Sequence, residues 1–346
     1  QSEGFRWPAE WESHRATWLA WPHNPETWPG HLAAAEAAFV EMVRALAPGE
    51  LVRVNVADAA LEARVRGLVG REAARRVECF AFPTDDAWVR DHGPVFVTRG
   101  RERAVLDFRF DAWGGKYPPW DRDDAVPRQV AEALGLPRFA ADFVLEGGSV
   151  DGDGQGTVLT TESCLLHPNR GPGRDREVME RRLADFLGAR RVVWLAGAVE
   201  GDATVGDVYD LTRFVAPGVV FPVVEHDDRE ALHGASLENL QRLRGARDAQ
   251  GKPLTVIELP MPPPVRAGKD RLPASYANFY LANGVALVPV FDVPSDERAL
   301  AILAEGLPGR RVVPIPARDL VFGLGAVHCL PQQEPEASDT HVRPPA

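Results

Sequence analysis

The chain has 346 residues, of which 45% are hydrophobic and 26% charged, a composition typical of a globular protein with a sizeable core. Its formal net charge of −11 argues against nucleic acid as a partner and favours a small cationic ligand. No apolar run is long enough to span a membrane, and the N-terminus lacks the pattern of a secretion signal. We therefore expect a cytoplasmic protein with no membrane partner.

The three cysteines, Cys79, Cys164 and Cys329, are odd in number and far apart. This argues against a disulfide framework and fits a reducing compartment. Neither a CxxC nor an HExxH spacing occurs, so we expect no metal site.

The first regular elements can be predicted from local signals. An amphipathic helix is predicted over 31–47, and Pro48-Gly49 directly after it is expected to end the helix. Alternating apolar residues over 51–56 predict a half-buried strand, and a second helix is predicted over about 59–69.

Beyond these elements one pattern recurs: a helix ends, a short basic or glycine-containing turn follows, and a strand begins. The predicted strands start near Val77, Phe139, Val192, Val256 and Val312, at steps of 62, 53, 64 and 56 residues. Five helix-and-strand units with a period near sixty indicate radial repetition within one α/β domain.

Four glycine-rich loops between these units hold carboxylates and indoles. They cover residues 85–94, 110–117, 145–151 and 200–210. Each alone is typical of a solvated turn. In a radial fold, however, loops that occur once per unit converge at one end, where carboxylates and aromatic rings suit a planar cation.

A fifth loop, residues 322–335, delivers Cys329 after two glycines and before Pro331, which we expect to stop regular structure. Glycines let a backbone approach a ligand closely, and a thiol in such a loop is a candidate nucleophile. A lone cysteine is also a common structural residue. The acidic loops favour the nucleophile, whereas Cys79 and Cys164 are predicted to be packed and unreactive.

At these residues the chain closely resembles agmatine deiminases, of the bacterial peptidylarginine-deiminase type within the guanidine-modifying (pentein) superfamily. The matching blocks are Trp88-Val89-Arg90-Asp91, residues 112–119, Glu146-Gly147-Gly148, residues 160–166, residues 272–280 and His328-Cys329. The resemblance runs from about Pro8 to Pro335. It implies an α/β fold that is a five-bladed, pseudo-symmetric ββαβ propeller (the pentein fold). This would be a single domain over 1–346, with its core at about 8–335 and a flexible tail over 336–346.

The resemblance also implies the hydrolysis of agmatine to N-carbamoylputrescine and ammonia, a reaction of putrescine biosynthesis that needs no cofactor. A thiolate attacks the guanidinium carbon, ammonia leaves, and water hydrolyses the thiouronium intermediate. The implied catalytic residues are Cys329, Asp91, Glu146 and Asp207, and the implied substrate-binding residues are Trp88, Trp113, Tyr209, Gly325 and His328. The expected partner is a small cationic guanidine, and a homo-oligomer is compatible with the sequence.

One loop departs from the family pattern Gly-Asp-Asp-Thr-Asp-Gly-His-x-Asp. Asp207 replaces the general acid/base histidine, and Tyr209 replaces a carboxylate that grips the guanidinium. On an extended segment both side chains would face the site and Asp210 would face away. An ordinary aspartate is ionised at neutral pH and is a poor acid, so we expect slow turnover unless burial keeps Asp207 protonated.

Three interpretations follow: an agmatine deiminase or a close guanidine hydrolase, at full or reduced rate; a related hydrolase with an altered substrate; and a pseudoenzyme that binds a cation. The retained Cys329, Asp91, Glu146 and Trp88 favour the two enzymes. The two substitutions in one loop favour the last two interpretations. Family membership favours the first.

Overall fold

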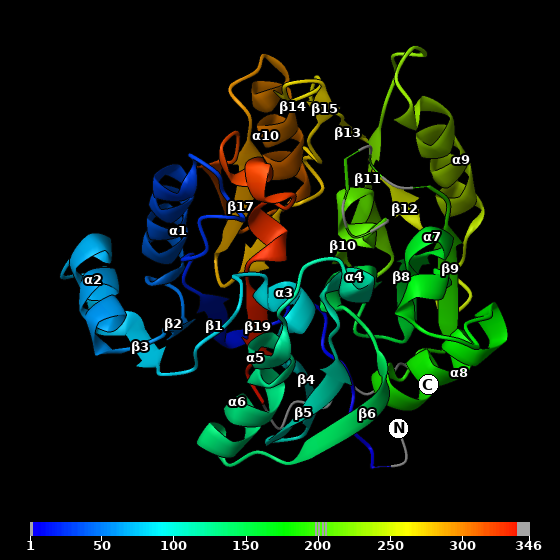
Figure 1. Ribbon diagram of the computed structural model, residues 1–346. Coiled ribbons are helices and arrows are strands. Elements are labelled where there is room, and N and C mark those ends of the chain that lie inside the picture. Colours follow the sequence, from blue (N-terminus) through cyan, green and yellow to red (C-terminus); the bar gives the residue numbers. More distant parts are fainter. Residues whose placement is uncertain (1–2, 198, 200, 203, 205, 338–346) are drawn as a thin grey trace.

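The structure is a computed structural model that describes residues 3–197, 199, 201–202, 204 and 206–337. Its fold is mixed α/β (Figure 1). Most of the predicted tail, residues 338–346, lies outside the described residues.

Five units, each made of one sheet and its helix or helices, repeat one order of elements. In each unit two antiparallel strands are followed by a helix and a parallel strand. One consists of β4 (Val95–Arg99), β5 (Glu102–Arg109), α6 (Val126–Leu134) and β6 (Arg138–Val144). The next consists of β7 (Val150–Gly152), β8 (Thr157–Thr161), α8 (Arg176–Leu187) and β9 (Arg191–Leu195). The third consists of β10 (Thr212–Ala216), β11 (Val219–Val224), α9 (Leu232–Gly245), β12 (Thr255–Val256) and β13 (Leu259–Pro260).

The fourth unit consists of β16 (Tyr280–Ala282), β17 (Val285–Val290), α10 (Ser295–Gly306) and β18 (Arg311–Pro316). The fifth joins the two ends of the chain, because β19 (Gln332–Pro335) pairs antiparallel with β1 (His14–Ala20). It continues through α1 (Leu32–Leu46), β2 (Leu51–Asn55), α2 (Ala59–Val69) and β3 (Val77–Phe80).

The repeat read from the sequence is therefore present in the strand order. Helices α1 and α2, strand β2 and the five marked strands lie where they were predicted. As expected, Pro331 lies in no helix or strand and follows the end of the turn at 327–329, but strand β19 begins at the next residue. No closed sheet joins the five sheets within the described residues, and the radial, five-bladed arrangement stays a prediction.

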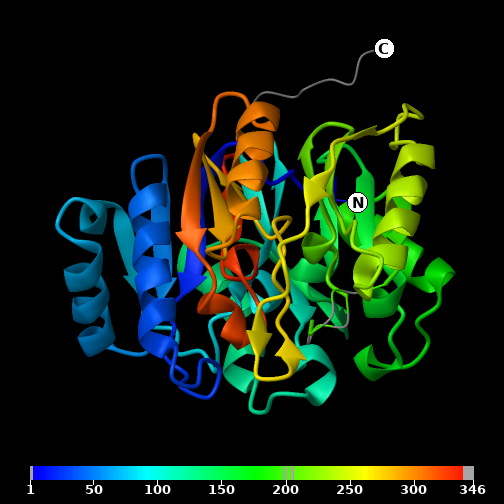
Figure 2. The same cartoon turned by 90° about the horizontal axis from the view of Figure 1, so that it is seen from above.

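Short elements, rather than the long helices, lie in the middle of the molecule. Figure 1 shows α1, α2, α6, α8, α9 and α10 at the periphery, with α3 (Val89–His92) and α4 (Ala112–Gly115) nearer the centre. Figure 2 shows a hairpin, β14 (Arg266–Ala267) and β15 (Asp270–Arg271), beside the C-terminal turn η5 (Leu320–Gly323). These short elements thus come from distant parts of the chain.

A buried ionic cluster connects several of these sheets. Glu10 is 4% exposed, and its carboxylate lies 2.8 Å from Arg213 Nη2, 3.0 Å from Arg90 Nη2 and 2.7 Å from His328 Nε2. It also accepts the backbone N–H of Leu281. Burial alone would raise the pKa of Glu10, but Arg213, His328 and Arg90 together hold it well below its usual value. We call Glu10, Arg90, Arg213 and His328 the Glu10 cluster.

Glu10→Ala is expected to lower the free energy of unfolding by about 3–5 kcal/mol, because two buried arginines lose their shared carboxylate. Urea denaturation measures this. Glu177→Ala is the matched control, since Glu177 pairs with Arg181 on the surface of α8, where an ion pair contributes at most about 1 kcal/mol. Equal losses in both variants would contradict a central role for the Glu10 cluster.

Candidate active site

One cavity of about 1350 Å³ collects most of the sequence-predicted site residues. Six of them line it: Trp88, Asp91, Trp113, Tyr209, Gly325 and Cys329. Glu146, Asp207 and His328 are buried and are not among the lining residues. Hairpin β14–β15 and turn η5 contribute further residues to its wall.

Cys329 ends the 3-10 turn η6 (Val327–Cys329) and is 3% exposed. Its Sγ lies 3.3 Å from two donors, the backbone N–H of Ala326 and Nδ2 of Asn278. A Cβ on Gly325 would lie 2.5 Å from the Trp88 indole and 3.0 Å from Cys329 Sγ. Only glycine fits between the nucleophile candidate and the indole.

Burial raises the pKa of the Cys329 thiol well above its usual value, and Asp210 and Asp91 raise it further. Hydrogen bonds from Tyr209 and Asn278 oppose this shift. Without a cation in the cavity, Cys329 is therefore a neutral thiol at pH 7.

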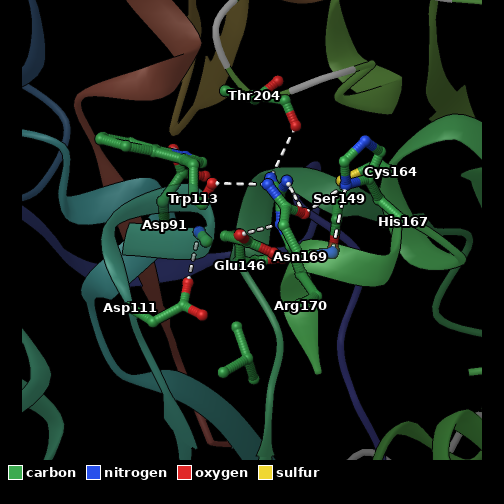
Figure 3. Close-up of polar contacts among 12 residues, drawn as sticks. Asp91, Asp111, Trp113, Glu146, Ser149, Cys164, His167, Asn169, Arg170 and Thr204 are labelled. Carbon is green, nitrogen blue, oxygen red and sulfur yellow. Dashed lines mark hydrogen bonds and ion pairs between the residues drawn. The ribbon is translucent and has the colours of Figure 1, made fainter. Parts of the chain in front are cut away.

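Two indoles line the cavity with this thiol. The Trp88 ring packs on the ring of Trp28, with 5.3 Å between the ring centroids. Trp113 has a φ of 58° and follows Ala112 with a φ of 52°, so two successive residues with side chains adopt a left-handed conformation. Such strain costs roughly 1–2 kcal/mol per residue. Asn169 Nδ2 holds it in place by donating to the Trp113 carbonyl (Figure 3).

Asp91 is fixed by two donors: Oδ1 accepts the backbone N–H of Gly148 at 3.0 Å, and Oδ2 lies 3.3 Å from Trp113 Nε1. Burial raises the pKa of Asp91 well above its usual value, and the nearby Asp207 and Glu146 raise it further. The site thus concentrates carboxyl groups that repel one another while no cation is bound.

Glu146 differs from Asp91 because it already has a cationic partner. Arg170 Nε lies 2.8 Å from Glu146 Oε1, and both side chains are almost fully buried. Figure 3 shows Arg170 between Glu146 and Thr204, whose carbonyl accepts from Arg170 Nη2 at 2.6 Å. Arg170 was not predicted as a site residue, although it lies just beyond the matching block at residues 160–166.

The loop that departs from the family pattern, here called the altered loop, contains Asp207 and Tyr209. With Cys164 these two residues form a compact group of acid, phenol and thiol. Tyr209 Oη donates to Asp207 Oδ2 at 2.6 Å, and Cys164 Sγ donates to Asp207 Oδ1 at 3.4 Å. Burial, Asp202 and Glu146 together raise the pKa of Asp207 to about 7. An acid with a pKa near 7 can both accept and donate a proton at neutral pH.

The expectation that Asp210 faces away from the site is wrong. Residues Val208–Asp210 form a 3-10 turn, η4, so the alternation of an extended strand does not apply. Asp210 Oδ1 accepts from Asn278 Nδ2 at 2.6 Å, and the same amide contacts Cys329 Sγ. Asn278 lies in the matching block at residues 272–280, but its position in the sequence does not show that it would touch the thiol.

His328 does not line the cavity and belongs to the Glu10 cluster. Burial lowers the pKa of His328 well below its usual value, and Arg213 and Arg90 lower it further. Its ring lies 5.0 Å from that of Tyr209. The imidazole thus packs beside Tyr209 in the protein interior, and a role in substrate binding stays a prediction.

The other two cysteines differ in burial. Cys164 is fully buried, whereas Cys79 is only half-buried, and burial raises the pKa of Cys79 to about 11. Across the described ranges, no group of histidine, cysteine and acidic side chains could hold a metal ion. In the same part of the chain, no helix has the length and apolarity needed to cross a membrane.

An α/β protein with a thiol among carboxylates and indoles has the features of a guanidine-modifying enzyme. Residues 6–335 match the family of Porphyromonas-type peptidyl-arginine deiminases, and the chain belongs to this family. An agmatine deiminase of Ectopseudomonas mendocina (strain ymp) is 38% identical over 359 residues, which cover 97% of this chain and 96% of that protein.

Solved structures agree with this assignment. The agmatine deiminase of Enterococcus faecalis superposes with a TM-score of 0.91 at 32% identity, covering 97% of both chains. A cysteine-to-serine variant of the agmatine deiminase of C. jejuni, with substrate bound, has a TM-score of 0.88 at 26% identity, covering 96% of this chain and 97% of that one.

Asp207→Asn is expected to stabilise the fold, and more so at pH 8 than at pH 5. The folded-state pKa of Asp207, about 7, lies above the usual value of 3.8, so ionising this carboxyl destabilises the folded state as the pH rises through 7. Between pH 5 and pH 8 the advantage of the variant should grow on the order of 2 kcal/mol.

Urea denaturation of both proteins at the two pH values measures this difference. Asp227→Asn is the matched control, because Arg229 lowers the pKa of Asp227 to about 2 and that carboxylate stays ionised throughout the range. An advantage of Asp207→Asn that does not change with pH would show that this carboxyl does not titrate near neutrality.

Proposed function

We propose that this chain is an agmatine deiminase, which hydrolyses agmatine to N-carbamoylputrescine and ammonia. The observation that carries the proposal is that Cys329 lines one cavity with Asp91 and two indoles. The near full-length relatives, which are agmatine deiminases, support the same substrate. The altered-substrate and non-catalytic interpretations have no comparable support.

The charge of the site accounts for the choice of a cation. Asp91, Asp207 and Asp210 all have raised pKa values because they are buried near other carboxyl groups. A guanidinium relieves this repulsion and stacks on the indoles of Trp88 and Trp113. It also lowers the pKa of Cys329, because a nearby positive charge favours the thiolate.

The reaction then proceeds in two halves. Cys329 Sγ bonds to the guanidinium carbon, and ammonia leaves after protonation, which gives a thiouronium. Water next attacks that carbon, and the C–S bond breaks to return the sulfur to Cys329. In this proposal Asp91 holds the guanidinium nitrogens, and the Glu146–Arg170 pair sets the charge behind them. His328 acts through Tyr209, whose ring it packs against.

We also propose that the five repeated sheets form the blades of a propeller. The shared strand order of all five sheets and the pairing of β19 with β1 support it. A cytoplasmic location and a homo-oligomer remain predictions from the sequence.

Cys329→Ser is expected to lose turnover while keeping ligand binding. Ammonia and ureido product from agmatine should fall at least about 10³-fold, because serine is a far weaker nucleophile here. Agmatine should still raise the melting temperature of the variant, since binding to the native state stabilises it. A neutral urea is the control ligand. Unchanged turnover in the variant, or no shift with agmatine, arginine or other guanidines in either protein, would contradict the proposal.

The altered loop is predicted to make turnover slower than in the family pattern. Asp207→His with Tyr209→Asp restores the family residues and is expected to raise kcat/KM for agmatine by roughly 10²–10⁴. Each single change should restore little, because residues of one catalytic unit are not additive. A double variant no faster than the native protein would show that the present pair is as effective as the pair that it replaces.

A further inference from the structure

Asp207 is separated from the cavity by Tyr209. The Asp207 side chain is fully buried and is not among the lining residues, whereas Tyr209 lines the same cavity as Cys329. A Cβ on Gly148 would lie 2.0 Å from the Tyr209 ring and 2.9 Å from Asp207 Oδ2, so glycine at this position leaves room for both side chains. Tyr209 therefore offers a route for a proton between the reacting atoms and Asp207.

The phenol is bonded to one end of that path and lines the cavity that holds the other. Its Oη lies 2.6 Å from Asp207 Oδ2, and Tyr209 and Cys329 line the same cavity, where Tyr209 lowers the pKa of the thiol. A phenol has one proton and can also accept. While Tyr209 donates to Asp207, its oxygen can accept the proton of the thiol. Tyr209 thus connects the cavity that holds Sγ to the buried carboxylate of Asp207.

From this path, and resting on the proposed deiminase function, we propose that Tyr209 is a catalytic residue that relays protons between the reacting atoms and Asp207. Tyr209 would then do more than fill the place of a lost carboxylate. With Asp207 it would form a two-residue acid/base that does part of the work of the family histidine, at a lower rate.

The proton balance closes over the two halves of the reaction. As Sγ bonds to carbon, the thiol proton moves to Tyr209 Oη, and the phenol proton moves to Asp207. Asp207 then returns a proton through Tyr209 to the departing nitrogen, the C–N bond breaks, and ammonia leaves. When water attacks, one of its protons takes the same route to Asp207 and returns to the sulfur as the C–S bond breaks. The other proton leaves the product oxygen for solvent, where it protonates the released ammonia.

The charges around Asp207 suit an acid that works near neutral pH. The groups that face it are Asp202, Glu146, Arg170, Tyr209, Cys164, Asp91 and Asp210. The carboxyl groups favour the protonated acid, and Arg170 favours the ionised form. We expect kcat/KM for agmatine to rise with pH through about 7, because the relay needs an ionised Asp207 to receive the first proton.

Tyr209→Phe tests the relay because it keeps the ring and removes only the hydroxyl. Tyr276→Phe is the matched control: Tyr276 is equally buried and donates to Asp296 at the same 2.6 Å, but it does not line the cavity. For Tyr209→Phe we expect kcat to fall roughly 10²–10³-fold with little change in KM, and the rise of kcat/KM through pH 7 to disappear. In an Asp207→Asn background the same change should have little further effect.

Alkylation of Cys329 by iodoacetamide provides a readout that needs no turnover. The rate at Cys329, followed by peptide mass mapping against pH, should shift upward by about one pH unit in Tyr209→Phe, because the thiolate loses a donor. Tyr276→Phe should leave both the profile and the turnover unchanged.

The outcomes separate this inference from the proposed function. An unshifted alkylation profile, or a kcat and pH dependence like those of the control, would overturn the relay even if agmatine is turned over. A shifted profile in a protein that turns over no guanidine would refute the proposed function and still support the proton path from thiol to phenol. A shifted profile together with the loss of kcat supports both.

Discussion

The buried carboxylate of Glu10 is the interaction on which the site depends most. It pairs with Arg213 from β10, Arg90 from α3 and His328 from η6. Arg90 immediately precedes Asp91, and His328 immediately precedes Cys329. One carboxylate at the N-terminal end of the chain thereby fixes the backbone of two site residues that lie more than two hundred positions apart in sequence. Polar groups buried this deeply hold a geometry only when every partner is present, so the cluster sets the position of the nucleophile relative to the carboxylate that faces it.

The candidate site itself carries an electrostatic cost that the remainder of the fold has to offset. Asp91, Asp207 and Asp210 are buried within range of one another, and Arg170 is already engaged with Glu146. Two residues in left-handed conformations add backbone strain beside them. A cationic ligand relieves the repulsion, so the empty site is less favourable than the occupied one. Local features that lower stability and recur at one cavity are typical of a functional site.

Local signals predicted the elements well, and contacts between distant segments were harder to foresee. Helix α2 and the starts of five strands follow from periodicity and from turn residues, which act within a few positions. The loops of the site were also located, because glycine, tryptophan and acidic residues are conspicuous in sequence. The pairing of Arg170 with Glu146 and the contact of Asn278 with Cys329 were missed, since tertiary packing alone brings these partners together. Asp210 was placed on the wrong face because a strand was assumed where the chain makes a 3-10 turn.

The two substitutions in the altered loop are best understood as one change. The resemblance implies a family pattern in which a histidine stands two residues before a carboxylate; here a short acid, Asp207, stands two residues before a long phenol, Tyr209. The acid alone does not reach the cavity, and the phenol alone, with its pKa raised well above the usual value, is a weak acid/base at neutral pH. Joined at 2.6 Å, they combine the reach of one residue with the titration range of the other. A site that had merely lost its function would have no need for the two replacements to fit each other, and this complementarity favours a working acid/base over a decayed one.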